Sequence, residues 1–190
     1  MKIGVLALQG AVRPHREVLE ALGADPVEIR TADDLVAVDA VVLPGGESTT
    51  MSFLLDSAGL RAPLRARLTD GLPALGTCAG MILLARDVLD GRSDQESLGA
   101  IDIDVRRNAF GRQRESFEAA LSVPAFGGAP FTAVFIRAPV VERVGESVEV
   151  LATVSGRPVL CRSGSIVVSS FHPELGDDLR LHRLFLEEIV

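Results

Sequence analysis

The feature that most restricts the fold is a five-residue turn, Gly76-Thr77-Cys78-Ala79-Gly80, between an apolar run and a segment of helical character. It matches the nucleophile-elbow pattern Gly-x-Ser-x-Gly, with cysteine in place of serine. A sharp strand-to-helix turn strains the backbone of its central residue, and the flanking glycines remove Cβ atoms that would clash with nearby backbone. A position at a helix N-terminus favours a thiolate. Cys78 is therefore a candidate nucleophile, and a buried structural cysteine is the alternative.

Strands and helices alternate with short connections over the first half of the chain, which is typical of a doubly wound parallel sheet. Ser48 is predicted to cap the helix that begins there. The expected strands are 2–8, 27–29, 39–43 and 74–76, and the expected helices are 12–22, 32–35, 48–57, 60–68 and an elbow helix that ends near residue 86.

After Gly91 the pattern changes to short strands separated by turn residues, with hairpin turns expected at Gly156-Arg157 and Ser163-Gly164. The predicted fold is α/β and three-layered: a flavodoxin-like, doubly wound, mostly parallel sheet with an added antiparallel ribbon in the C-terminal half. With 190 residues, the chain is expected to form one domain, 1–190. The strands expected here are 101–105, 115–121, 131–136, 148–154, 158–162 and 166–169, followed by a helix from 177 or 178 to 188.

The composition excludes several classes of function. A net charge of −7, without a basic patch interleaved with aromatic residues, argues against nucleic-acid binding. No segment approaches the ~18 apolar residues of a membrane span, and the N-terminal apolar run is too short for a signal peptide. Two distant cysteines without a CxxC pattern or histidine cluster predict no metal site. We expect a cytoplasmic protein with reduced thiols, no cofactor, and no membrane or nucleic-acid partner.

The base for Cys78 is expected at His172, which follows the last predicted strand. The carboxyl ends of parallel strands meet at one sheet edge, where the elbow also lies. Pro173 favours an extended backbone at His172, so Glu174 can point to the same side and accept a hydrogen bond from the ring. This predicts a Cys78–His172–Glu174 triad, and a histidine that only closes a turn is the alternative.

Three other residues receive weaker predictions. His15, in the first helix, is expected to have no catalytic role. His182 lies on the last helix among leucines and is expected to be a packing or surface residue. Cys161 lacks flanking glycines and is expected to fill a strand.

An oxyanion hole needs preorganised backbone N–H donors. The stretch Pro44-Gly45-Gly46-Glu47-Ser48 combines a strand end, two glycines and a helix N-terminus. We predict that the N–H groups of Gly46 and Ala79 form the hole, and an ordinary strand-to-helix turn is the alternative. The stretch is not a P-loop, because no Gly-Lys-Ser/Thr follows it.

Three motifs together resemble those of the class I, or triad, glutamine amidotransferases: 76–80, 44–48 and Phe171-His172-Pro173-Glu174. Within that class the sequence is similar to the glutaminase subunits of pyridoxal 5′-phosphate synthase. The similarity covers essentially the whole chain. It is carried by GVLALQG at 4–10, PGGESTT at 44–50, TCAGMILLA at 77–85, RNAFGRQRESF at 107–117 and the tail 170–186.

The resemblance implies a specific reaction and partner. Cys78 would attack the side-chain amide of L-glutamine and form a γ-glutamyl thioester, with His172 as base and acid and Glu174 orienting it. The ammonia would pass to a separate barrel-shaped synthase subunit, where it joins a pentose phosphate and glyceraldehyde 3-phosphate to give pyridoxal 5′-phosphate. The substrate contacts implied by the family pattern are Gly46, Glu47, Ser48, Arg107, Ile136 and Arg137.

The residues support part of this pattern independently. A guanidinium suits the α-carboxylate of glutamine, so Arg107 and Arg137 fit a binding role, with an ordinary surface charge as the alternative. Two positions depart from the family pattern: Ala11 stands where an acidic residue is common, and Pro14 lies in the first helix. Details of docking to the partner therefore stay open.

Three other functions are compatible with parts of the sequence. One is the glutaminase subunit of another amidotransferase, such as imidazole glycerol phosphate synthase, against which the RNAFGRQ stretch argues. A second is an ester or peptide hydrolase with the same triad. A third is a subunit that binds without catalysis, against which the complete triad argues.

Overall fold

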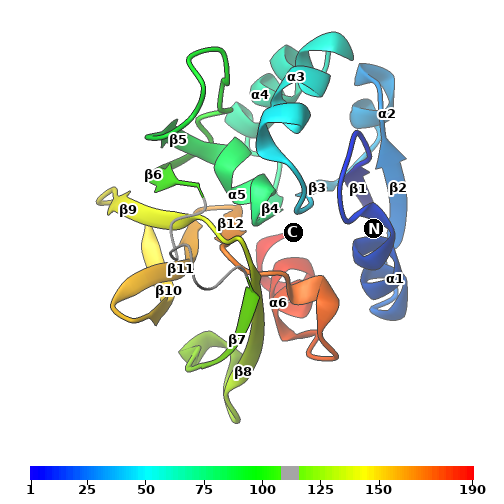
Figure 1. The fold of residues 1–190 in the computed structure, drawn as a ribbon. Helices are drawn as coiled ribbons and strands as arrows, with labels where there is room; N and C mark the ends of the chain where they lie inside the picture. Colours follow the sequence, from blue (N-terminus) through cyan, green and yellow to red (C-terminus); the bar gives the residue numbers. More distant parts are fainter. Residues whose placement is uncertain (108–115) are drawn as a thin grey trace.

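A seven-stranded sheet forms the centre of the molecule in the computed structural model, which describes residues 1–107 and 116–190 (Figure 1). Its strand order is β10-β11-β12-β4-β3-β1-β2. The five strands from β12 to β2 run parallel, and β10 and β11 extend the sheet in antiparallel fashion. These strands are β1 Lys2–Leu6, β2 Asp25–Ile29, β3 Ala40–Leu43, β4 Ala74–Thr77, β10 Glu149–Val154, β11 Arg157–Ser163 and β12 Ile166–Ser169.

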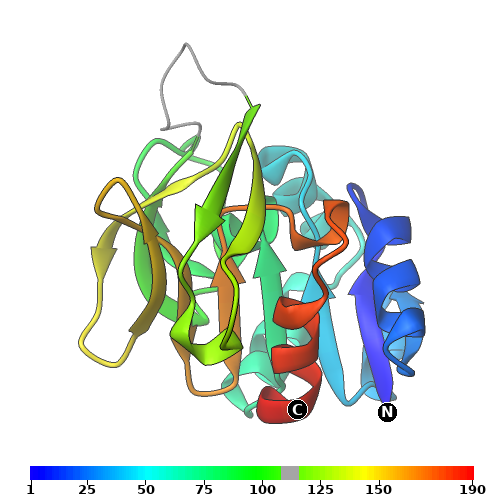
Figure 2. The ribbon, with the colours of Figure 1, turned by 90° about the horizontal axis from the view of Figure 1, so that it is seen from below.

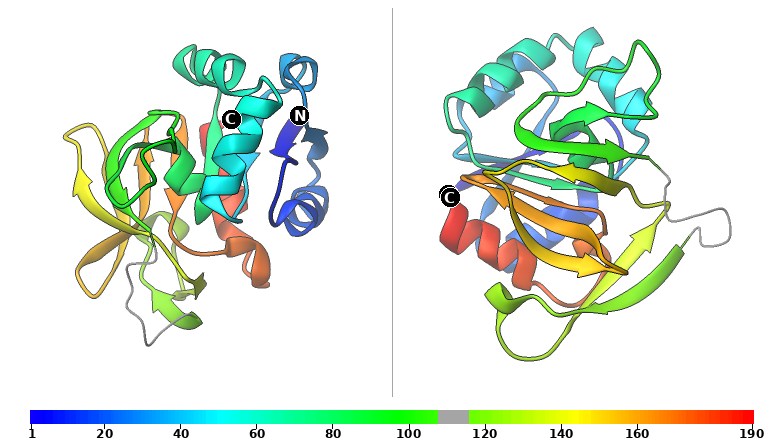
Figure 3. Two further views of the ribbon diagram at one scale, coloured as in Figure 1. Left: turned by 45° about the horizontal axis from the view of Figure 1, so that its top comes forward. Right: turned by 90° about the vertical axis from the view of Figure 1, so that its left-hand side faces the viewer.

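Both faces of the main sheet are covered, because alternate residues of each strand point to opposite sides. Val41 and Leu43 of β3 pack into a cluster with α2, α3, α4 and α5, whereas Ala40 and Val42 pack with α1, α6 and the β7-β8 ribbon. Figure 2 looks onto the face with α6 and the ribbon, and the right-hand view of Figure 3 shows helices on both sides. The helices are α1 Val12–Ala21, α2 Ala32–Val36, α3 Ser48–Ser57, α4 Arg61–Thr69, α5 Ala79–Leu84 and α6 Arg180–Leu184.

Two smaller sheets complete the fold. The antiparallel ribbon β7 Ser116–Leu121 and β8 Phe131–Ile136 confirms the predicted ribbon. A three-stranded sheet, β5 Ala85–Val88, β6 Ile101–Arg106 and β9 Val140–Val144, was only partly expected, since the sequence predicts β6 but neither β5 nor β9. Within the motif 107–117, residues 108–115 lie outside the described part of the chain, as does the predicted start of β7 at 115.

The three-layer α/β fold is as predicted, but several element boundaries are wrong. The elbow helix ends at Leu84 and not near Arg86, because Ala85 leaves the helical region and pairs with Ile101. The last helix is shorter than predicted and begins at Arg180. It continues as a π-helical segment, Phe185–Ile189.

The predicted N-cap of α3 is also wrong. Glu47, and not Ser48, caps this helix: the Glu47 carboxylate accepts hydrogen bonds from the N–H groups of Thr49 and Thr50 at 3.1 and 2.6 Å. The longer carboxylate reaches two free donors at once, with the negative charge that a helix N-terminus favours.

The turns of the two hairpins lie one residue from their predicted positions. Val154 pairs with Arg157, so Ser155 and Gly156 form the first turn, and both have positive φ angles of 51° and 75°. Ser163 pairs with Ile166, which places Gly164 and Ser165 in the second turn. The register of each strand pair, and not the glycine alone, decides which residues turn.

No helix in the described ranges combines the length and apolar character needed to span a bilayer. Many apolar residues of the described chain are buried in the two clusters on either side of the main sheet.

Gly80 makes the close approach between α5 and β3 possible. A Cβ atom added at Gly80 would lie 1.9 Å from the carbonyl oxygen of Leu43, too close for any real contact. We expect Gly80→Ala to lower the free energy of unfolding by about 1–3 kcal/mol, measured by urea denaturation. The matched control is Gly176→Ala, where the nearest atom would be 3.9 Å away. Equal stability of the two variants would contradict this account.

Candidate active site

Cys78 occupies the sharp turn between β4 and α5, at the carboxyl edge of the main sheet. Its φ of 50° and ψ of −103° place its backbone in a strained region that costs about 1–3 kcal/mol. The Cys78 N–H donates to the carbonyl oxygen of Ser169 at 2.8 Å, which continues the pairing of β4 with β12 into the turn. The surrounding hydrogen bonds therefore hold the elbow in its strained form.

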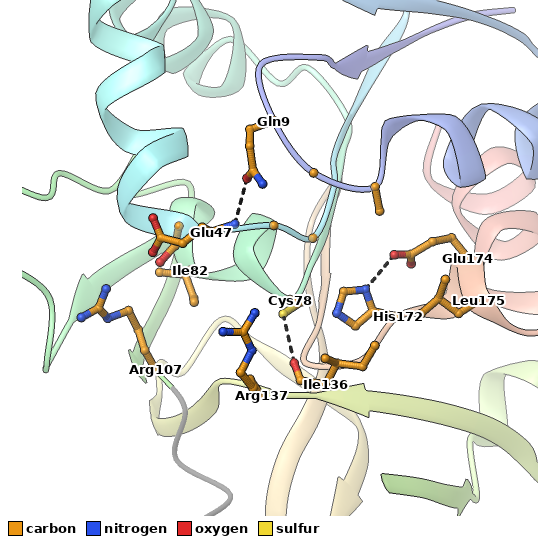
Figure 4. A pocket seen from close by; sticks show the side chains of 15 residues that line it. Gln9, Glu47, Cys78, Ile82, Arg107, Ile136, Arg137, His172, Glu174 and Leu175 are labelled. Atoms are coloured by element: carbon orange, nitrogen blue, oxygen red, sulfur yellow. Dashed lines mark hydrogen bonds and ion pairs between the residues drawn. The ribbon is translucent and has the colours of Figure 1, made fainter. Parts of the chain in front are cut away.

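His172 and Glu174 follow β12, the parallel neighbour of β4, and so reach the same edge as Cys78. His172 Nδ1 lies 2.7 Å from Glu174 Oε1, and the other ring nitrogen points toward Cys78 (Figure 4). The backbone differs from the extended form predicted at this point, because Pro173–Leu175 is a 3-10 turn. The His172 N–H also donates to the carbonyl oxygen of Val134 at 2.8 Å, so β8 helps to position the ring.

Electrostatics favour an imidazolium in this position. Burial disfavours the charged form of His172, but hydrogen bonds with Cys78 and Glu174 outweigh it and raise the pKa of His172 from 6.5 to about 10. Burial acts to raise the pKa of Glu174, yet its hydrogen bond to His172 and the proximity of His15 keep that pKa below its usual value. Glu174 is therefore an ionised carboxylate behind the ring.

The second cysteine is chemically different. Cys161 lies on β11 and is completely buried. Burial raises the pKa of the Cys161 thiol to about 12, so the thiol stays protonated near neutral pH. Its position within a strand matches the sequence prediction.

The other two histidines, His15 and His182, form a pair behind Glu174, and sequence reasoning did not connect this pair with the site. His15, on α1, is completely buried, with Nε2 3.1 Å from Thr77 Oγ1 and 3.4 Å from Glu174 Oε2. Its Nδ1 lies 3.0 Å from Nε2 of His182, a completely buried residue of α6. Burial lowers the pKa of both His15 and His182, so both rings are neutral.

An open cavity of about 400 Å³ lies in front of Cys78. Nearly all the predicted site residues line it: Gly46, Glu47, Ser48, Cys78, Arg107, Ile136, Arg137, His172 and Glu174. Ala79 does not line the cavity and is 1% exposed. Only its backbone N–H, in the first turn of α5, could therefore take part in the site. The cavity also includes Gln9, Gly10, Ala11, Gly45, Ile82 and Leu175, outside the predicted set.

The glycine loop after β3 is held against the loop between β1 and α1. Ala11 N–H donates to the carbonyl oxygen of Gly45 at 2.9 Å. Because N–H and C=O point in opposite directions in a trans peptide, the Gly46 N–H points away from Ala11. A Cβ atom at Gly45 would approach His172 Cε1 to 2.3 Å, so only glycine fits beside the ring.

Gln9 provides a second tie between these two loops. Its side-chain oxygen accepts the backbone N–H of Glu47 at 2.8 Å, and its side chain also lines the cavity. Gln9 belongs to the GVLALQG stretch at 4–10, which was the available signal in the sequence.

The two arginines of the cavity are held differently. Arg107 donates from Nη1 to Thr49 Oγ1 at 2.8 Å and to Gln95 Oε1 at 3.2 Å, and from Nη2 to the carbonyl oxygen of Asp90 at 3.0 Å. Arg137 follows β8 with a positive φ of 45°, and it lines the same cavity as Cys78 (Figure 4). Arg107 is thus a fixed positive charge, whereas Arg137 extends into the open part of the cavity.

No group of three or more His, Cys, Asp and Glu side chains within 1–107 and 116–190 is arranged to hold a metal ion. The chemistry available in the cavity is that of a thiol, an imidazole, a carboxylate and two guanidinium groups. This set suits nucleophilic attack on an uncharged carbonyl group of a substrate that carries a carboxylate.

Comparison with known proteins agrees with this chemistry. The family model of the SNO glutamine amidotransferases matches residues 5–190. The chain belongs to the SNO glutamine amidotransferase family. The pyridoxal 5′-phosphate synthase subunit PdxT of Frankia alni is 58% identical over 186 residues, which cover 98% of this chain and 94% of the relative.

Two further comparisons extend this result. The PdxT subunit of Frankia casuarinae is 56% identical over 188 residues, which cover 99% of this chain and 94% of the relative. A crystal structure described as a glutamine amidotransferase superposes with a TM-score of 0.92 at 49% identity, covering 97% of both chains. The amidotransferase fold therefore extends over nearly the whole chain.

The strain at Cys78 predicts an unusual order of stability for two variants. Alanine keeps a Cβ atom at φ 50°, whereas glycine relieves the strain and loses only backbone entropy. We expect the Cys78→Gly variant to be more stable than the Cys78→Ala variant, with a free energy of unfolding about 1 kcal/mol higher in urea denaturation. At Ser57, an exposed position in α3, alanine should be the more stable of the two. The same order at both positions would contradict strain at the elbow.

The pKa of His172 should depend on Glu174. The variant Glu174→Gln keeps the shape of the side chain but removes the negative charge that stabilises the imidazolium. We expect the pKa of His172, measured by NMR titration, to fall by about one unit or more. Glu17→Gln, at an exposed position of α1, is the control and should leave that pKa unchanged. An unaltered His172 pKa in Glu174→Gln would show that another group sets it.

Proposed function

We propose that the chain is the glutaminase subunit of a pyridoxal 5′-phosphate synthase, hydrolysing L-glutamine and supplying ammonia to a barrel-shaped synthase subunit. The observation that carries the proposal is the placement of Cys78, His172 and Glu174 at one end of a cavity that two arginines enter. The choice of synthase rests on the relatives, which are named as subunits of that enzyme and align over nearly their full length. We further propose that 1–190 acts as one cytoplasmic amidotransferase domain.

The reaction begins with transfer of the Cys78 thiol proton to His172, which gives a thiolate paired with an imidazolium. Cys78 Sγ attacks the side-chain carbonyl carbon of glutamine, and the oxygen gains a negative charge that the N–H groups of Gly46 and Ala79 stabilise. His172 donates its proton to the leaving nitrogen, so the C–N bond breaks, ammonia leaves, and a γ-glutamyl thioester remains on Cys78.

The second half of the reaction reverses the role of the ring. His172, now neutral, takes a proton from a water molecule that attacks the thioester. The C–S bond breaks, glutamate leaves, and the thiolate and imidazolium form again. Glu174 stays ionised throughout and holds the ring through Nδ1, while the charge on the imidazolium appears and disappears.

The substrate is proposed to lie across the cavity, with its amide near Cys78 and its α-carboxylate toward Arg107 and Arg137. The backbone of Gly46, Glu47 and Ser48 lines one side, and Ile136 lines the opposite side. The side chain of Glu47 already caps α3 and its backbone N–H donates to Gln9, so we propose that Glu47 contacts glutamine through its backbone carbonyl oxygen.

An activity assay with a nucleophile variant tests the proposal. We expect wild-type chain plus synthase subunit to form glutamate and ammonia in equal amounts, and Cys78→Ala to reduce the rate by about 10⁴-fold or more. Binding of the variant to the synthase subunit, measured by size-exclusion chromatography, should be retained, because Cys78 is 8% exposed.

Two controls make this assay specific. Cys161→Ala should keep the wild-type rate, since that thiol is buried away from the cavity. An activated ester replaces glutamine in a parallel assay, and preferred turnover of the ester would favour the hydrolase alternative. Ammonia release by Cys78→Ala at the wild-type rate would remove Cys78 from the mechanism.

A further inference from the structure

The carboxylate of Glu174 is held between two histidines and not by one. Its Oε1 is bound by His172 Nδ1 at 2.7 Å, while Oε2 faces His15 Nε2 at 3.4 Å. Within the described part of the chain, Oε2 has no hydrogen-bond partner of normal geometry. Since the Glu174 side chain is completely buried, the electrostatic environment of Oε2 depends on which nitrogen of His15 carries the proton.

The proton of the neutral His15 ring can lie on either nitrogen, and the two forms differ sharply toward Glu174. A proton on Nε2 gives an N–H that donates to Thr77 Oγ1 at 3.1 Å and brings its positive end near the negative carboxylate, whose Oε2 lies 3.4 Å from Nε2. A proton on Nδ1 directs a lone pair at the carboxylate, which is repulsive. In a completely buried site this difference is large, because little solvent screens it. The Nε2-protonated form of His15 is therefore the favoured one.

This form of His15 determines which nitrogen of His182 carries the proton. The unprotonated Nδ1 of His15 must accept a hydrogen bond, and the atom within reach is His182 Nε2 at 3.0 Å. His182 must then carry its proton on Nε2. Its Nδ1, which has no partner among the described residues, is left as an acceptor, and this leaves no buried N–H unpaired.

We propose that His182 is a positioning residue for the glutaminase reaction: it donates to His15, fixes the tautomer in which His15 faces Glu174 with an N–H, and thereby keeps Oε1 aligned on His172. The inference rests on the proposed function for its catalytic consequence. Neither His15 nor His182 lines the cavity, so neither contacts glutamine directly. Their effect on the reaction passes through Glu174.

Two substitutions at His182 separate positioning from packing. His182→Phe keeps a ring of similar size but cannot donate, so Nδ1 of His15 loses its hydrogen bond and the His15 ring is no longer fixed in tautomer and orientation. We expect kcat for glutamate formation, measured with the synthase subunit, to fall about tenfold while KM stays within about twofold. His182→Gln replaces Nε2 by an amide nitrogen that can donate, and kcat should return to within about threefold of wild type.

A variant of the next residue controls for changes in α6 itself. Arg183→Gln alters an exposed side chain whose ion pair with Glu187 is at the surface, and it should match wild type in kcat and KM. If His182→Phe does not fold, the kcat of His182→Gln relative to wild type still tests whether a donor at position 182 is sufficient. A kcat for His182→Gln reduced about tenfold, although His15 still carries its proton on Nε2, overturns the inference.

The tautomers can be read directly, without any turnover. Long-range ¹H–¹⁵N correlation spectra distinguish protonated from unprotonated ring nitrogens, and we expect Nε2–H on both His15 and His182 in the wild-type chain. A wild-type His15 protonated on Nδ1, or equal kcat values in the Phe and Gln variants, overturns the positioning role. If the wild-type chain with its synthase subunit has no glutaminase activity, the proposed function is wrong. The tautomer measurement does not depend on that outcome.

Discussion

The parallel pairing of β4 with β12 is the interaction on which the candidate site depends. Thr77 and Ser169 are register partners at the ends of these strands, and the pairing continues as the hydrogen bond from Cys78 N–H to the Ser169 carbonyl. One strand leads into the elbow, and the other leads to His172 and Glu174. Residues nearly a hundred positions apart thus meet because two short, apolar, fully buried strands share one register. Without this pairing, neither the strain at Cys78 nor the charge on His172 would be maintained.

Much of this arrangement could be predicted from the sequence, because it follows from local signals. Strand–helix alternation predicted the layered sheet, and the glycines around Cys78 predicted a turn that only small neighbours permit. The proximity of His172 to Glu174 was also predicted, although a 3-10 turn and not an extended segment brings them together. The missed strands β5 and β9 carry charged residues that hide their period: Arg86 of β5 and Arg143 of β9 both bind Asp104 of β6. Tertiary ion pairs of this kind leave no pattern along the chain.

The contact between His15 and His182 was not predicted from the sequence, for a related reason. Each residue lies on a helix whose sequence reads as ordinary, and only packing on the same side of the sheet places the two rings in contact. A lone histidine on an apolar helix face is usually a packing residue, so nothing in either segment distinguished them. Their significance depends on burial and on distances to Glu174, which no spacing rule contains.

The position of β12 has a consequence for how the protein is made. β12 is the last strand in the chain, yet it lies between β11 and β4 in the interior of the sheet. While the ribosome is still adding residues before 166, the growing polypeptide carries Cys78 without His172 and Glu174, the base and carboxylate proposed to activate it. Insertion of β12 therefore joins β11 to β4 in the sheet, and the same step brings His172 and Glu174 to the thiol of Cys78. The thiol of a nascent chain therefore lacks both groups until residues 166–174 have been added, and premature termination before His172 would leave it without them.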